Sequence, residues 1–226
     1  QHRLEDRLAE AASAYGAYAS VRSGILDAYT LERQGDAYFS AGKYAEALNT
    51  YNAATVVPRL GSGQELQIKI GQTRAALGDY AGALAQYDSI AQTGNDFIKA
   101  QMDYLSGSAY KFLGQTDKMN ERFLHAVENY PVSYYSYLSL VELVDAGVPV
   151  SDLDRGIVDY FAGQYEVGIV ALDRALAAGR ARRRNGPGNS PQGTMPGPFQ
   201  DLPAAPLVSG RRLEHRLLQL PQPARP

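Results

Sequence analysis

Apolar residues recur at helical spacing through residues 28–178, and small residues among them recur on a longer period. Six positions repeat every 36 residues in three copies, and a fourth copy follows after 49 residues. Two series of glycines, seven residues apart, mark the copies: Gly35, Gly71, Gly107 and Gly156, then Gly42, Gly78, Gly114 and Gly163. A large residue follows in each copy, namely Tyr51, Tyr87, Phe123 or Leu172. A fixed period of this length indicates an array of repeated supersecondary units.

Each unit is predicted to be a pair of helices joined by a short turn. The glycine in the middle of the first helix lets the second helix approach closely. The second glycine ends the first helix, because glycine adopts the left-handed conformation without a Cβ penalty. The large residue of the second helix is expected to fill the space between units, and stacking buries the apolar face that one hairpin leaves exposed. We predict such units at about 28–61, 64–97, 100–130 and 149–178, within an array over 31–178.

Two further helices are predicted outside these units. Residues 3–21 place Leu4, Leu8, Ala11, Tyr15 and Tyr18 on one face. We interpret residues 1–30 as the N-terminal helix or helices of a truncated preceding repeat, because apolar residues at this spacing form one stripe of a helix. A second, extra helix is predicted at 132–146, between the third and fourth units, with Ser133 as its candidate N-cap. The whole body is therefore expected to be all-α.

The composition changes abruptly near residue 178. Residues 179–226 contain nine of the twelve prolines, eight Arg, no Lys and none of the sixteen tyrosines. Their net charge is +6, which leaves −8 for residues 1–178. A segment rich in Pro and Gly, with few large apolar residues, cannot bury enough surface to offset its ordering entropy. We therefore predict a disordered Pro/Gly/Arg-rich tail over 179–226, apart from a short helix at 213–220.

Two interpretations of this tail stay open. In the first, Arg180 and the three arginines at 182–184 form an anion-binding arm for nucleic acid, acidic lipid or a teichoic-type polymer. In the second, the tail is a solvated linker or the product of a shifted reading frame. The switch from Lys and Tyr to Arg, Pro and Gly falls just after a predicted helix, so we favour the second interpretation.

The repeat resembles the tetratricopeptide repeat. The resemblance rests on four stretches: GDAYFSAGKYAEALNTYNAA (35–54), GQTRAALGDYAGALAQYDSI (71–90), GSAYKFLGQTDKMNERFLHA (107–126) and GIVDYFAGQYEVGIVALDRA (156–175). The period is about two residues longer than the family's usual length, and we place the extra residues in loops between units such as 58–64. The resemblance implies a right-handed α-solenoid whose first helices line a concave, partner-binding face.

The extra helix is similar to a segment of a second family. The matching residues lie in YPVSYYSYLSLVELVDAG (130–147): Ser133, Tyr134, Tyr135, Tyr137 and Leu138. They look like the Ser/Thr-Tyr-Tyr helix in the superhelical domain of bacterial soluble lytic transglycosylases, and the match continues to about residue 176. The resemblance implies a periplasmic or extracytoplasmic place in the bacterial cell envelope and contact with peptidoglycan or partner proteins. The cytoplasm stays the alternative location.

No catalytic role follows from this second resemblance. The catalytic Glu of lytic transglycosylases lies in a Glu-Ser motif of a separate domain, and no Glu-Ser pair occurs in this sequence. That role is therefore assigned to no residue here. If the parent protein is such an enzyme, we expect its catalytic domain to lie beyond residue 178 of the intact gene.

Composition limits the remaining chemistry. The chain is 45% hydrophobic and 20% charged, which excludes a fully disordered protein, and its net charge of −2 argues against nucleic acid as the main partner. The sequence has no cysteine, and its histidines, His2, His125 and His215, show no metal-ligand spacing. Asp152 and Asp154 are interpreted as first-turn acids of a helix. No apolar run has the roughly 18 residues of a membrane span. We expect no catalytic residue, cofactor or metal site.

The tetratricopeptide resemblance also implies which residues line the groove. The family's groove positions correspond here to Tyr29, Glu32, Asp36, Phe39, Gln72, Tyr104, Ser108, Lys111, Phe112, Tyr160 and Phe161. This groove is aromatic with few cations. Glu32 and Asp36 stand where relatives that grip a C-terminal carboxylate carry cations or Asn, so we do not expect chaperone-tail binding. Each ring could stack on a sugar, anchor an apolar peptide side chain or simply pack between helices.

These inferences predict a non-catalytic scaffold that binds a protein or peptide through an aromatic concave groove, with peptidoglycan as a further candidate ligand. The alternative is a fragment of the helical superstructure of a peptidoglycan lytic transglycosylase without its catalytic domain.

Overall fold

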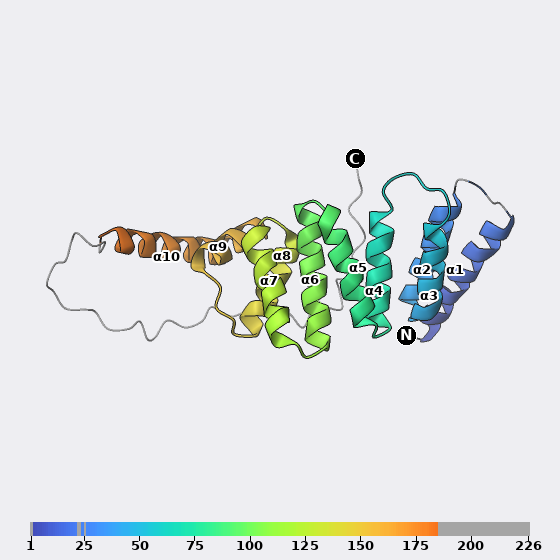
Figure 1. Cartoon of the computed structure of the whole chain (residues 1–226), viewed down its shortest axis with the longest axis horizontal. Coiled ribbons are helices and arrows are strands. Elements are labelled where there is room, and N and C mark those ends of the chain that lie inside the picture. Colours follow the sequence, from blue (N-terminus) through green and yellow to red (C-terminus); the bar gives the residue numbers. More distant parts are fainter. Residues whose placement is uncertain (1, 22–23, 25, 185–226) are drawn as a thin grey trace. The chain divides into compact units, whose positions relative to one another are not determined.

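The computed structural model describes residues 2–21, 24 and 26–184, and this part of the chain contains ten α-helices and no strand (Figure 1). The helices are α1 (His2–Val21), α2 (Asp27–Ser40), α3 (Tyr44–Thr55), α4 (Gln64–Ala76), α5 (Tyr80–Thr93), α6 (Asp96–Phe112), α7 (Thr116–Asn129), α8 (Tyr134–Asp145), α9 (Asp152–Phe161) and α10 (Tyr165–Arg184). The predicted all-α class is confirmed. Residues 1–175 form one compact unit, which ends within α10.

Successive helices of this unit pack against one another in chain order, from α1 to α9 (Figure 1). The middle glycine of each first helix lies directly under a large side chain of the second. A Cβ added at Gly35 would lie 2.5 Å from the Tyr51 ring, and one at Gly107 would lie 2.3 Å from the Phe123 ring. Gly71 has the same relation to Tyr87, and Gly156 to Leu172. The predicted close approach within each hairpin is confirmed.

The second glycine series ends the first helices as expected. Gly42, Gly78, Gly114 and Gly163 have φ values of 73°, 81°, 68° and 81°. This left-handed region is strained for residues with a Cβ, so the glycines turn the chain at no such cost. The turn between the two helices of each hairpin is consequently only three residues long: 41–43, 77–79, 113–115 and 162–164.

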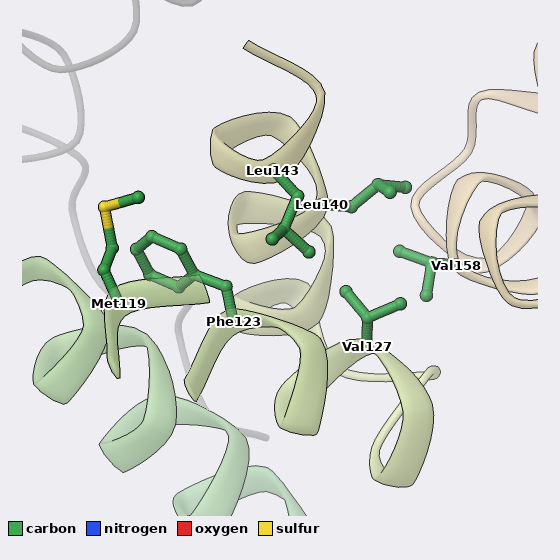
Figure 2. Close-up of a cluster of buried hydrophobic side chains, with 6 residues drawn as sticks. All are labelled: Met119, Phe123, Val127, Leu140, Leu143 and Val158. Atoms are coloured by element: carbon green, nitrogen blue, oxygen red, sulfur yellow. The ribbon is translucent and has the colours of Figure 1, made fainter. Parts of the chain in front are cut away.

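The extra helix α8 begins at Tyr134, after an N-cap at Ser133 whose hydroxyl accepts a hydrogen bond from the Tyr135 N–H. The helix packs against both α6 and α7. Figure 2 shows the apolar cluster that results, with residues of α7, α8 and α9 pointing toward one another: Met119, Phe123, Val127, Leu140, Leu143 and Val158. α8 therefore joins the third hairpin to the helix pair that follows it.

The last helix runs past the predicted boundary of the array. α10 continues to Arg184, whereas the tail was predicted to begin at residue 179. Gly179 lies inside this helix and does not end it, since a single glycine inside a helix costs only about 1 kcal/mol. The rest of the predicted tail, with its short helix at 213–220, lies outside the described residues. Among the described helices, none is both long and apolar enough to cross a membrane.

Candidate functional site

All eleven predicted groove residues lie on the first helices of the hairpins. Four lie on α2, one on α4, four on α6 and two on α9: Tyr29, Glu32, Asp36, Phe39, Gln72, Tyr104, Ser108, Lys111, Phe112, Tyr160 and Phe161. Their membership of one continuous groove stays a prediction. Their individual surroundings differ, and they divide into a set of ion-paired residues and a set of aromatic ones.

The acidic pair on α2 belongs to a charged network with the next hairpin. Glu32 accepts hydrogen bonds from Arg59 at 2.9 Å and from Lys69 at 2.8 Å. Lys69, on α4, also lies 2.9 Å from a carboxylate oxygen of Asp36. These cations come from a loop and from a helix position that the groove prediction did not include. The acids are therefore neutralised within the chain by cations from outside the predicted groove positions.

The electrostatics of this network follow from the pairing. Burial by itself would raise the pKa of Glu32, but the hydrogen bonds and charges of Lys69 and Arg59 outweigh it and lower that pKa. Burial would likewise lower the pKa of Lys69, but Glu32 and Asp36 outweigh it and raise that pKa. Each group thus stays charged across the neutral range because its partner is charged.

Tyr51 links this network to the hairpin core. Its ring lies over Gly35, and its hydroxyl donates a hydrogen bond to Asp36 at 2.7 Å. Burial, and then the neighbouring Asp36 carboxylate, raise the pKa of Tyr51 well above its ordinary value. The side chain also belongs to an apolar cluster with Leu66 and Ile70 of α4, so it fills space both within its hairpin and toward the next one.

On α6, two of the predicted groove residues have intramolecular partners. Lys111 donates to Glu142 of α8 at 2.7 Å. The Ser108 hydroxyl donates to the Tyr104 carbonyl one turn earlier. The Lys111 side chain is half-exposed, and Glu142 already balances its charge. Lys111 thus links α6 to α8, whereas the Ser108 hydroxyl bonds within its own helix.

The predicted aromatic residues are exposed to different degrees. Tyr104 is half-buried and its ring lies within 6.0 Å of the Phe123 ring, which supports the packing interpretation for this residue. Phe112 is 74% exposed, although its ring stacks on Tyr80 of the preceding hairpin with centroids 5.6 Å apart. Tyr29, Tyr160 and Phe161 are 41%, 45% and 60% exposed. Side chains of this size on first helices remain the part of the site that a partner can reach.

One polar cluster was missed by the sequence analysis. Asp103 of α6 is buried, and its carboxylate oxygens lie 2.6 Å from His125 Nδ1 and 3.3 Å from Arg122. Arg122 also donates to Asp88 of α5 at 2.8 Å. The His125 side chain is half-exposed. An aspartate among the buried positions Met102, Ser106 and Gly107 was the signal that could have revealed this cluster.

The acids of α9 divide into cap residues and one buried carboxylate. Asp152 and Asp154 lie in the first turn, as predicted. The helix follows an N-cap at Ser151. Asp159 is 5% exposed, and Arg155 Nε lies 3.5 Å from its Oδ2 without hydrogen-bond geometry. Burial raises the pKa of Asp159, and Arg155 offsets only part of this. In the described part of the chain, no cluster of three or more His, Asp or Glu could hold a metal ion.

Comparison with known proteins adds no family assignment. No protein-family model matches the sequence, and no curated protein matches it.

Proposed function

We propose that the chain is a non-catalytic scaffold, a right-handed α-solenoid of tetratricopeptide-like hairpins that binds a protein segment through the aromatic side chains of its first helices. One observation supports the proposal most directly: Phe112, Tyr160 and Phe161 stay 45–74% exposed on these helices. Exposed aromatic side chains are typical anchors for a protein partner, since they bury much apolar area at small entropic cost.

The partner is expected to be recognised by apolar anchors rather than by charge. Glu32, Asp36 and Lys111 already have ion-pair partners within the chain. A charged partner would have to break these pairs before it gained new ones, and the exchange would yield little net free energy. An extended peptide with large apolar or aromatic side chains therefore suits the site best. Peptidoglycan in the bacterial cell envelope is the other ligand we consider.

A peptide library displayed on phage, selected against the full chain, tests this proposal. We expect enriched peptides to share aromatic or large aliphatic anchors. The Phe112→Ala substitution should weaken the selected peptides about tenfold, or about 1.4 kcal/mol, because it removes a large exposed anchor. Val56→Ala is the matched control, since Val56 is 83% exposed and lies outside the first helices.

Thermal unfolding of both variants separates lost binding from lost folding, because Phe112 also stacks on Tyr80. Phe161→Ala is a second test variant on another hairpin. If no peptide is enriched, or if both Phe variants bind the selected peptides as tightly as the wild type, the scaffold proposal is wrong.

We also propose a second candidate, in which the chain is part of the helical superstructure of a peptidoglycan lytic transglycosylase. Its support is that Ser133 caps a helix that begins at Tyr134 and packs on two helices of the preceding hairpin. The test is the coding DNA beyond codon 178, read in all frames. Further hairpins followed by a Glu-Ser motif would support this candidate, and stop codons in every frame would remove it.

A further inference from the structure

A polar cavity of about 490 Å³ lies among α4, α5 and the loop before α4. Its walls are Ser62, Gln64, Gln67, Gln86, Ser89, Ile90 and Thr93. None of these residues belongs to the predicted groove or to an ion pair of the network described above. The volume lies within the range of small-molecule sites in proteins, so the cavity can admit a ligand of a few ring units.

The chemistry of the wall is uniform. Apart from Ile90, every residue that lines the cavity carries an uncharged amide or hydroxyl group. Such groups both donate and accept hydrogen bonds. A charged ligand would lose hydration there without meeting a countercharge. A neutral ligand whose own groups both donate and accept is the better match.

Two of the amides are held in place by each other. Gln86 Nε2 donates to Gln67 Oε1 at 2.6 Å. The Gln86 side chain also lies against Gly71 of α4, where a Cβ would come within 3.3 Å of its Cγ. This pairing uses the Gln67 carbonyl oxygen and one Gln86 N–H group, and it holds the two amides against each other at the cavity wall. Both amides are half-buried, and groups whose orientation is already set lose less entropy on binding.

One wall of the cavity is apolar. Ile90 is 6% exposed and belongs to the buried cluster that contains Tyr87, Ala83 and Met102. A saccharide ring has an apolar C–H face and an edge of hydroxyl groups, which is the same combination of surfaces. We propose that this cavity binds a saccharide unit of an uncharged glycan.

The loop that completes the cavity is anchored. Arg59 pairs with Glu32 of α2, and the Leu60 carbonyl accepts a hydrogen bond from the Tyr29 hydroxyl at 3.0 Å. Ser62 lies two residues after Leu60, and Gly63 turns the chain into α4 with a φ of 66°. Residues assigned to the groove by sequence thus also hold this wall. The saccharide proposal does not depend on what the groove binds.

Nuclear magnetic resonance titration of the labelled full chain with maltotriose and cellotriose tests the proposal. We expect millimolar binding that shifts the side-chain amides of Gln67 and Gln86, and weaker binding of glucosamine and glucuronate, which carry charge. Gln86→Leu should weaken binding about tenfold, since it removes a fixed hydrogen-bonding group. Gln72→Leu is the matched control, because Gln72 is an amide of α4, the helix that carries Gln67, and lies outside the cavity.

Thr93→Val is a second test variant that should fold normally, because it removes one hydroxyl from the cavity wall at nearly constant volume. It should also weaken binding. The proposal is overturned if neither neutral trisaccharide shifts these amides, or if Gln86→Leu and Thr93→Val bind as the wild type does. It is also overturned if an uncharged peptide rich in Gln and Ser shifts the amides and the trisaccharides do not.

Discussion

At the scale of single residues, Tyr51 and Tyr87 occupy the same position of the repeat, but their hydroxyl groups have different surroundings. The Tyr51 hydroxyl donates to Asp36, whereas no hydrogen bond to the equally buried Tyr87 hydroxyl occurs among the described residues. Burial raises the pKa of both phenols. The third hairpin has Phe123 at this position, so packing requires the ring, and the hydrogen bond from the hydroxyl to Asp36 is a feature of the first hairpin.

The hydroxyl of Tyr51 should therefore contribute to stability, and that of Tyr87 should not. We expect Tyr51→Phe to lower the free energy of unfolding by about 1–2 kcal/mol, since it removes a hydrogen bond to a carboxylate. Tyr87→Phe should change it by less than about 0.5 kcal/mol. Urea unfolding of the two variants checks this. Equal losses in both would show that the Asp36 hydrogen bond contributes nothing.

The buried carboxyl group of Asp159 should make the free energy of unfolding depend on pH, with the opposite sign to a salt-bridged acid. Burial raises its pKa in the folded protein above the ordinary value of 3.8. The folded state then binds more protons than the unfolded state as pH rises from 3.8, so stability falls over that interval and levels off above the folded pKa. Asp159→Asn should lack this component. Urea unfolding from acid to neutral pH, with Asp117→Asn at an exposed position as the control, measures the difference.

The contrary outcome is simple to recognise. If the stability difference between wild type and Asp159→Asn does not change with pH, the Asp159 carboxylate titrates equally in the folded and unfolded states. A difference that grows in favour of the wild type as pH rises would mean that Arg155 pairs with the carboxylate strongly enough to outweigh burial.

At the scale of the helical hairpin, stability depends on glycines that touch a ring. Gly107→Ala should destabilise the protein by about 1–3 kcal/mol, because a methyl 2.3 Å from the buried Phe123 ring has no room. Gly179→Ala is the control within a helix, where no atom lies within 4 Å of the added Cβ. It should stabilise by about 0.5–1 kcal/mol, the difference in helix propensity. Thermal unfolding compares them.

A double substitution identifies the contact. Combining Gly107→Ala with Phe123→Leu should cost less than the sum of the single substitutions, since the smaller side chain makes room for the methyl group. In the fourth unit a glycine likewise faces a leucine, because Gly156 lies against Leu172. That unit is not an exact parallel, since Gly168 of α10 also approaches the α9 backbone. Additive losses would mean that the two residues are not coupled.

The hairpin is also the level at which sequence was most informative. The glycines and the Ser133 cap were found from spacing and residue type alone, because each acts on backbone within a few residues of itself. The continuation of α10 to Arg184 was not found. A glycine followed by a run of arginines is typical of the C-terminus of a helix, but neither feature is sufficient to end a helix.

At the scale of the whole array, the apolar cluster of Figure 2 joins the consecutive helices α7, α8 and α9. A substitution in this cluster should therefore destabilise mainly these helices. Leu143→Ala, which opens a cavity at a fully buried position, should cost about 2–5 kcal/mol. In a repeat array each unit depends mainly on its neighbours. Amide hydrogen exchange should therefore accelerate in α7, α8 and α9 and change little in α2 and α3.

Val132→Ala is the control for this prediction, since Val132 precedes the same helix and is 65% exposed. It should leave both stability and exchange nearly unchanged. Uniform acceleration across α2–α9 in Leu143→Ala would instead mean that the hairpins unfold as a single cooperative unit.

Local sequence was sufficient for the helices, their turns and caps, and the glycine contacts within hairpins. These features join residues that are neighbours on one helix or across one short turn, so spacing and residue type determine them. The partners of the candidate site required the folded chain. Lys69 reaches Glu32, His125 reaches Asp103 and Lys111 reaches Glu142 across separate helices. Which side chains meet at such distances depends on how the helices pack, and the periodicity of a single helix carries no information about that.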